Sequence, residues 1–145
     1  MLIRRAEDND MEALLSMSLD FEREACCNGV RANQPSDLEG MDVFVAEESG
    51  FLTGYAYGRA ITDDKRCVWC EEGKYYELEE LYVRPAWRSQ GTGQQLFEQI
   101  CNEARGQGLH ALCLYAVGKD WQRLFRFYID RLGMTFWSAA MHMTL

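Results

Sequence analysis

Three glutamates in one apolar stretch are the side chains of this sequence best placed for acid–base chemistry. Glu77, Glu79 and Glu80 lie in Tyr75–Val83, whose aromatic, Leu and Val residues predict a strand. Strand alternation puts Glu77 and Glu79 on one face, together with Leu81, and Glu80 on the other. Carboxylates in a central strand are costly unless they face a wet cavity, so the pattern favours a general base. An exposed hairpin end or structural salt bridges would explain the same residues without catalysis.

A short basic loop with two glycines follows this strand. Pro85 cannot continue a ladder of hydrogen bonds, so the strand ends before it, and a helix is expected from Thr92 to about Arg105. The first turn of a helix offers free N–H groups and the positive end of the helix dipole, which together bind phosphate. Arg88 adds a fixed charge. The predicted phosphate-binding residues are Arg88, Ser89, Gln90, Gly91, Thr92 and Gly93.

Two familiar phosphate-binding motifs are excluded at this loop. A P-loop requires G-x-x-x-x-G-K-[ST], and the sequence contains no such string. A dinucleotide fingerprint requires G-x-G-x-x-G, and Leu96 stands where the third glycine belongs. The loop instead reads R-x-x-G-x-G, and the strand before it ends in L-Y-V-R-P at 81–85.

Together these two strings resemble the signature of the GNAT family of N-acetyltransferases, and the likeness extends over the whole chain. The resemblance implies that the backbone N–H groups of the loop hold the pyrophosphate of acetyl-CoA. It also implies that the strand splays from its neighbour, so that Leu81, Tyr82 and Val83 offer backbone groups to the pantetheine arm. The expected cosubstrate is therefore acetyl-CoA, and no metal is expected.

The same resemblance suggests catalytic residues. Glu79 followed by Val83 is similar to the base-bearing strand of polyamine and aminoglycoside acetyltransferases, and Glu77 is similar to the equivalent in other members. Tyr128 lies in a string similar to the family's F-Y-x-x-x-L-G segment, whose tyrosine protonates the departing CoA sulfur. A core tyrosine on an apolar helix face is the alternative. Trp121 or Asp120 replaces an asparagine of the family, so one pantetheine contact lacks its residue here.

Charge and hydropathy limit the kinds of partner. The chain has 145 residues, enough for a single domain over 1–145, and a net charge of −8. That charge disfavours nucleic acid and suits a cationic substrate. No run of 18 apolar residues occurs, so no membrane span is expected, and the start turns polar too soon for a signal peptide. We therefore expect a cytoplasmic protein.

Six cysteines are more consistent with reduced thiols than with a disulfide framework, because no export signal is present. Cys67 and Cys70 form a C-x-x-C, and Cys26 with Cys27 could complete a zinc site, but the spacing is irregular. No cysteine lies in the motif segments near Tyr128, which favours direct acetyl transfer over a cysteine relay.

The resemblance implies a mixed α/β GNAT fold, with a mostly antiparallel central sheet, one splayed parallel pair of strands and about four helices. Hydrophobic periodicity and turn residues predict strands at 2–6, 42–46, 51–60, 75–83, 109–117, 134–137 and 140–144. They predict helices at 11–19, 21–27, 92–105 and 120–132. Residues 28–40 receive no specific role.

The sequence therefore predicts an N-acetyltransferase that moves the acetyl group of acetyl-CoA directly to a primary amine. The acidic chain favours a small cationic amine, similar to a polyamine or an aminoglycoside. A protein N-terminus or a lysine is the enzymatic alternative, and a non-catalytic acyl-CoA-binding module is the other. A homodimer is compatible with either.

Overall fold

A five-stranded sheet forms the centre of the molecule, in the order β1-β2-β3-β4-β5. A computed structural model describes residues 1–62, 73–139, 141 and 143. The strands are β1 (Leu2–Arg5), β2 (Asp42–Glu48), β3 (Phe51–Ile61), β4 (Tyr75–Val83) and β5 (Leu112–Leu114). All neighbouring pairs are antiparallel except β4 and β5, which are parallel. The predicted mixed sheet with one parallel pair is confirmed.

Three α-helices occur in the described part of the chain, slightly fewer than expected. They are α1 (Met11–Glu24), α2 (Thr92–Gly106) and α3 (Trp121–Phe125), which continues as a π-helix over Arg126–Arg131. The separate second helix predicted at 21–27 is wrong, because α1 runs unbroken to Glu24 and ends at Ala25, whose φ is +49°. Asp120 caps the last helix: its side chain accepts a hydrogen bond from the Arg123 N–H at 3.0 Å.

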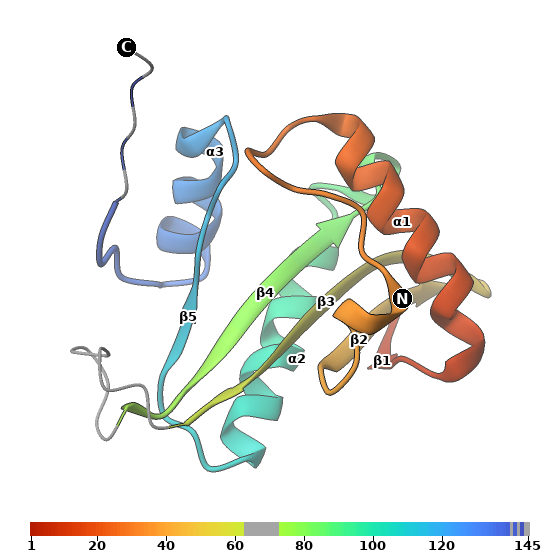
Figure 1. The fold of residues 1–145 in the computed structure, drawn as a ribbon, viewed down its shortest axis with the longest axis horizontal. Coiled ribbons are helices and arrows are strands. Elements are labelled where there is room, and N and C mark those ends of the chain that lie inside the picture. Colours follow the sequence, from red (N-terminus) through yellow and green to blue (C-terminus); the bar gives the residue numbers. More distant parts are fainter. Residues whose placement is uncertain (63–72, 140, 142, 144–145) are drawn as a thin grey trace.

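Helices α1 and α2 cover opposite faces of the sheet (Figure 1). Successive strand side chains point to opposite faces, so neighbouring residues join different cores. Tyr55 packs with Leu14 and Met17 of α1, whereas Ala56 lies in the cluster that contains Leu96 and Ile100 of α2. The sheet is thus enclosed between two apolar layers in its middle.

The C-terminal part differs from the prediction. Residues 134–137 do not form a strand; the Met134 N–H bonds the carbonyl of Tyr128, and Phe136 packs on Phe125 with ring centroids 5.4 Å apart. The strand predicted at 140–144 falls partly, and the C-x-x-C of Cys67 and Cys70 wholly, outside the described residues. No helix in the described ranges is long and apolar enough to cross a membrane.

Gly58 allows β3 and β4 to approach closely beside an irregularity in their pairing. A Cβ at Gly58 would overlap the carbonyl oxygen of Glu77 and come within 2.6 Å of the Tyr76 ring. We therefore expect Gly58→Ala to lower the free energy of unfolding by about 1–3 kcal/mol, measured by urea denaturation. Gly106→Ala is the matched control, because no atom lies within 4 Å of its added methyl, and it should not destabilise the protein. Equal effects of the two substitutions would contradict this packing.

Candidate active site

The loop after β4 has a geometry that only a few residue types adopt easily. Pro85–Trp87 forms a short 3-10 turn, after which Ser89 and Gly91 have φ values of +63° and +90°. Helix α2 then begins at Thr92, whose hydroxyl donates to the carbonyl of Trp87 at 3.2 Å. This path presents the first turn of α2, with its free N–H groups, at the end of β4, which suits a phosphate.

The lack of a side chain at Gly93 matters for packing, as well as for the approach of a ligand to the backbone. A Cβ there would lie 3.3 Å from the ring of Phe127 and 3.6 Å from Leu81. The first turn of α2 therefore packs directly on the π-helix that carries Tyr128. The glycine brings the predicted phosphate-binding loop and the predicted general acid into one region.

Arg88 is committed to contacts within the protein. Its guanidinium donates twice to the Glu24 carboxylate at 2.8 Å and once to the Val83 carbonyl at 2.7 Å, and it lies 5.5 Å from the centre of the Tyr82 ring. Glu24 also accepts from the Tyr82 hydroxyl. Arg88 thus ties the end of α1 to the end of β4, with its charge balanced by Glu24. A phosphate at this loop would be held mainly by backbone N–H groups.

β4 and β5 separate just where the resemblance requires a slot. Their ladder includes Tyr76 to Leu78 of β4, and among described strands Leu81–Val83 pair on the β3 side alone. Beyond the separation, Cys27 and Gly118 form an isolated bridge, and the Asn28 N–H bonds the Val117 carbonyl at 2.9 Å. Apart from the Val83 carbonyl, which accepts a hydrogen bond from Arg88, the edge of β4 at 81–83 is therefore available to an extended ligand.

A β-bulge rearranges the three glutamates. Tyr57 and Gly58 of β3 are consecutive, yet they pair with Glu80 and Leu78, so Glu79 is the extra residue. Because of this extra residue, Leu78 and Leu81 both face the α2 side. The predicted alternation is therefore wrong: Glu79 lines a hollow with Tyr57 on the α1 side and does not share the face of Leu81.

Glu80 is the third glutamate of β4, and strand alternation predicted it on the face opposite to Glu79. It is partly buried on the α1 side and accepts hydrogen bonds from the Tyr55 hydroxyl at 2.5 Å and the Asn33 amide at 2.9 Å. Burial raises the pKa of Glu80 above its usual value, although both hydrogen bonds oppose this. A carboxylate with a raised pKa is better matched to taking a proton near neutral pH.

Glu79 and Glu77 have different surroundings. Glu79 forms an ion pair with Arg59 at 3.5 Å and lies at the wall of the hollow. Glu77 lies between Arg59 of β3 and Cys113 of β5 in the pairing register. The structure thus brings Glu79 and Glu80 to the end of the β4–β5 ladder and leaves Glu77 within it.

Tyr128 lies on the π-helix, where it packs against Phe97 of α2 and Phe127. Burial, and then the nearby Cys27, raise the pKa of Tyr128 to about 12. The hydroxyl therefore stays protonated at neutral pH and can donate a proton.

Cys27 follows α1 and lies outside the motif segments, yet it is near enough to Tyr128 to affect its pKa. Burial first, followed by Cys26, Glu80 and Glu24, raises the pKa of Cys27 to about 11. The thiol is therefore a poor nucleophile at neutral pH, which weighs against a cysteine relay. Cys26 and Cys27 belong to no metal-ligand group within the described ranges, where no cluster of three suitable side chains occurs.

Several known proteins are similar to this chain in sequence or in fold. An L-methionine sulfoximine/L-methionine sulfone acetyltransferase of Salmonella typhimurium is 38% identical over 77 residues, which span 52% of this chain and 40% of that protein. The fold matches a predicted acetyltransferase with acetyl-CoA from Clostridium acetobutylicum, with a TM-score of 0.71, 19% identity and coverage of 99% and 95% of the two chains. It also matches the aminoglycoside N-acetyltransferase AAC(6')-Iy in complex with CoA, with a TM-score of 0.74, 16% identity and coverage of 99% and 98%.

The match to a family model covers more of this chain than the match to the Salmonella protein does. The model of the acetyltransferase (GNAT) family covers residues 9–134, from just before α1 through the predicted phosphate-binding loop and the π-helix with Tyr128. The chain therefore belongs to the acetyltransferase (GNAT) family.

Proposed function

We propose that this protein transfers the acetyl group of acetyl-CoA to the primary amine of a small molecule. The observation that carries the proposal is the convergence of three features at the end of β4. The α2 N-terminus follows the end of β4, residues 81–83 of β4 pair with no described strand on the β5 side, and Tyr128 and Glu80 both lie near Cys27. This arrangement suits a pyrophosphate, a pantetheine arm and a reacting thioester in that order.

The chain's own residues then divide the proton transfers. The amine nitrogen forms a bond to the acetyl carbon while the bond from that carbon to sulfur breaks. Glu80 takes the proton that the amine gives up, directly or through water, and Tyr128 supplies a proton to the departing thiolate. Glu79 lies at the wall of the hollow, where it attracts the ammonium form of the acceptor. Glu77 is the third candidate base.

Two classes of small acceptor have support. The net charge of −8 and the carboxylates of β4 favour a cationic amine, and AAC(6')-Iy is named for aminoglycosides. The Salmonella relative is named for methionine sulfoximine and methionine sulfone, which are amino acids. A protein N-terminus or lysine, and binding of acyl-CoA without turnover, remain the other outcomes of an activity assay.

A charge change at Ser89 tests the cofactor loop without altering its shape. Ser89 has a φ of +63°, a conformation that Asn and Asp tolerate, so both variants should fold. Acetyl-CoA should raise the Tm of wild type and of Ser89→Asn, because a ligand bound to the native state stabilises it. Ser89→Asp places a carboxylate beside the proposed pyrophosphate and should abolish most of that shift. Equal shifts in the Asp and Asn variants would refute this assignment.

A further inference from the structure

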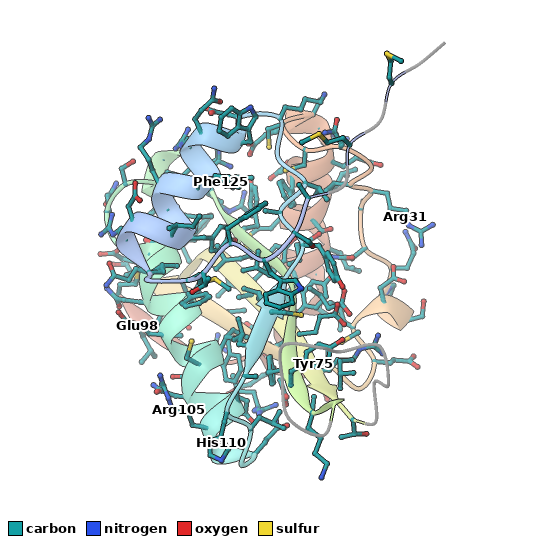
Figure 2. The ribbon with its side chains drawn as sticks, turned by 90° about the vertical axis from the view of Figure 1, so that its left-hand side faces the viewer. Arg31, Tyr75, Glu98, Arg105, His110 and Phe125 are labelled. Carbon is teal, nitrogen blue, oxygen red and sulfur yellow. The ribbon has the colours of Figure 1, made fainter. Side chains whose placement is uncertain are left out.

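A hollow of about 230 Å³ lies on the α1 side of the sheet, beside the β4 bulge. It is lined by Arg31, Asn33, Asp37, Met41, Tyr57 and Glu79. Four of these residues come from the connection between α1 and β2, and three of the four lie in the range 28–40, to which the sequence assigned no role. Figure 2 shows Arg31 at the outer edge of this connection, across the molecule from Glu98 and Arg105 of α2.

The inner wall of the hollow is built from a continuous hydrogen-bond network. The Asn33 N–H donates to the buried Ser18 hydroxyl at 2.8 Å, and its side-chain amide donates to Glu80 at 2.9 Å. The Tyr57 hydroxyl donates to the side-chain Oδ1 of Asn33 at 3.0 Å. Asn33 therefore fixes the loop to α1, β3 and β4, and it links the hollow directly to the proposed base.

Charge around the hollow is mixed rather than uniformly acidic. Asp37 and Glu79 supply carboxylates, and Arg31 supplies a guanidinium that forms no ion pair with any described residue. A polycation would meet Arg31 unfavourably. An acceptor with one ammonium and one anionic group would find an opposite charge for each.

The volume of the hollow also favours a small acceptor. Drug-sized ligands occupy pockets of about 300–1,000 Å³, so a hollow of about 230 Å³ suits a smaller molecule. An amino acid fits within this volume, whereas a multi-ring aminoglycoside would extend beyond it into solvent. Met41 adds an adaptable thioether surface for an apolar side chain.

We infer that this hollow is the acceptor site and that it takes an amino-acid-like acceptor, whose amine lies toward Glu79 and Glu80 and whose anionic group is bound by Arg31. The inference rests on the proposed acetyl transfer and narrows its acceptor class. Arg31 is then the residue that distinguishes amino acids from simple amines.

The test compares each amino acid with its own amide, for example L-methionine with L-methioninamide, alongside spermidine and an aminoglycoside. The amide loses the negative charge and keeps the amine, which is the more easily deprotonated of the two. A preference for the acid must therefore come from recognition of the carboxylate. Wild type should favour the acid in kcat/KM by ~10-fold or more, the scale of a hydrogen-bonded charge pair.

Arg31→Gln should raise KM for the acid by ~10-fold and leave KM for the amide unchanged. Arg31→Lys keeps the positive charge, so it should raise KM for the acid by less. Arg23→Gln is the matched control, because Arg23 lies on α1 outside the hollow. The inference is overturned if kcat/KM for the amides or for spermidine equals that for the best acid. It is also overturned if Arg31→Gln lowers kcat/KM equally for acid and amide. Acetylation of no acceptor at all would instead overturn the proposed function.

Discussion

Tyr128→Phe is expected to lower kcat by ~10²-fold or more, the usual contribution of a general acid. The substitution keeps the ring that packs against Phe97 and Phe127 and removes only the hydroxyl. Because burial raises the pKa of Tyr128 to about 12, the wild-type hydroxyl carries its proton throughout the neutral range. Initial rates at saturating acceptor and acetyl-CoA measure the effect, and the Tm of the variant should stay close to that of wild type.

Tyr76→Phe controls for the loss of a buried hydroxyl elsewhere. Tyr76 is fully buried, and its hydroxyl donates to Asp42 at 3.2 Å, away from the proposed reaction centre. This variant should lose a little stability and keep its kcat. If Tyr128→Phe also kept its kcat, Tyr128 would be a core residue of the π-helix and another group would protonate the thiolate.

Glu80→Gln is expected to reduce kcat by ~10²–10⁴-fold near neutral pH, with partial recovery as pH rises and the amine loses its proton in solution. Glutamine can still accept the hydrogen bonds from Tyr55 and Asn33 that position Glu80. It cannot take a proton from the amine. A pH–rate profile of wild type and variant measures both the loss and the recovery.

Although Glu80→Gln should lower kcat, it should not lower the stability of the protein. Burial raises the folded-state pKa of Glu80, so the ionised carboxylate lowers stability as pH rises through that pKa. Glutamine stays neutral, so the variant should melt at or above the wild-type Tm at pH 8, and the difference should shrink on acidification. A variant that is less stable and equally slow at every pH would indicate a structural role.

Glu79→Gln tests whether the neighbouring Glu79 attracts the cationic acceptor or takes a proton from its amine. Glu79 already pairs with Arg59 and lines the hollow, so its loss should raise KM for the amine more than it lowers kcat. If Glu79→Gln or Glu77→Gln reduced kcat more than Glu80→Gln, the base would be misassigned although the mechanism could stand.

The separation of β4 from β5 was expected from the family resemblance, whereas local signals in the sequence were sufficient for the strand, loop and helix around Gly91. Those features depend on neighbouring residues: Pro85 ends the strand, and the glycines permit the turn into α2. The bulge at Glu79 was missed because a bulge depends on how β4 pairs with β3. Gly58 inside β3 was the available signal, since glycines within strands often mark bulges.

Long-range contacts explain the other differences. The role of Asn33 depends on Ser18, Tyr57 and Glu80, which are distant in the sequence. The pairing of Arg88 with Glu24 likewise joins residues 64 positions apart. No local pattern reports such contacts, so a basic residue in the loop was assigned to phosphate although the fold pairs it with a carboxylate.

The most direct test of the account is amine-dependent release of CoA thiol by the wild-type protein, with the product identified by mass spectrometry. Incubation with acetyl-CoA and the panel of amino acids, amides, spermidine and an aminoglycoside should release thiol and form N-acetylated product in equal amounts. Binding is followed in the same samples by the Tm. If acetyl-CoA raised the Tm while no acceptor increased thiol release above the amine-free rate, the protein would bind acyl-CoA without transferring it, and the proposed function would be contradicted.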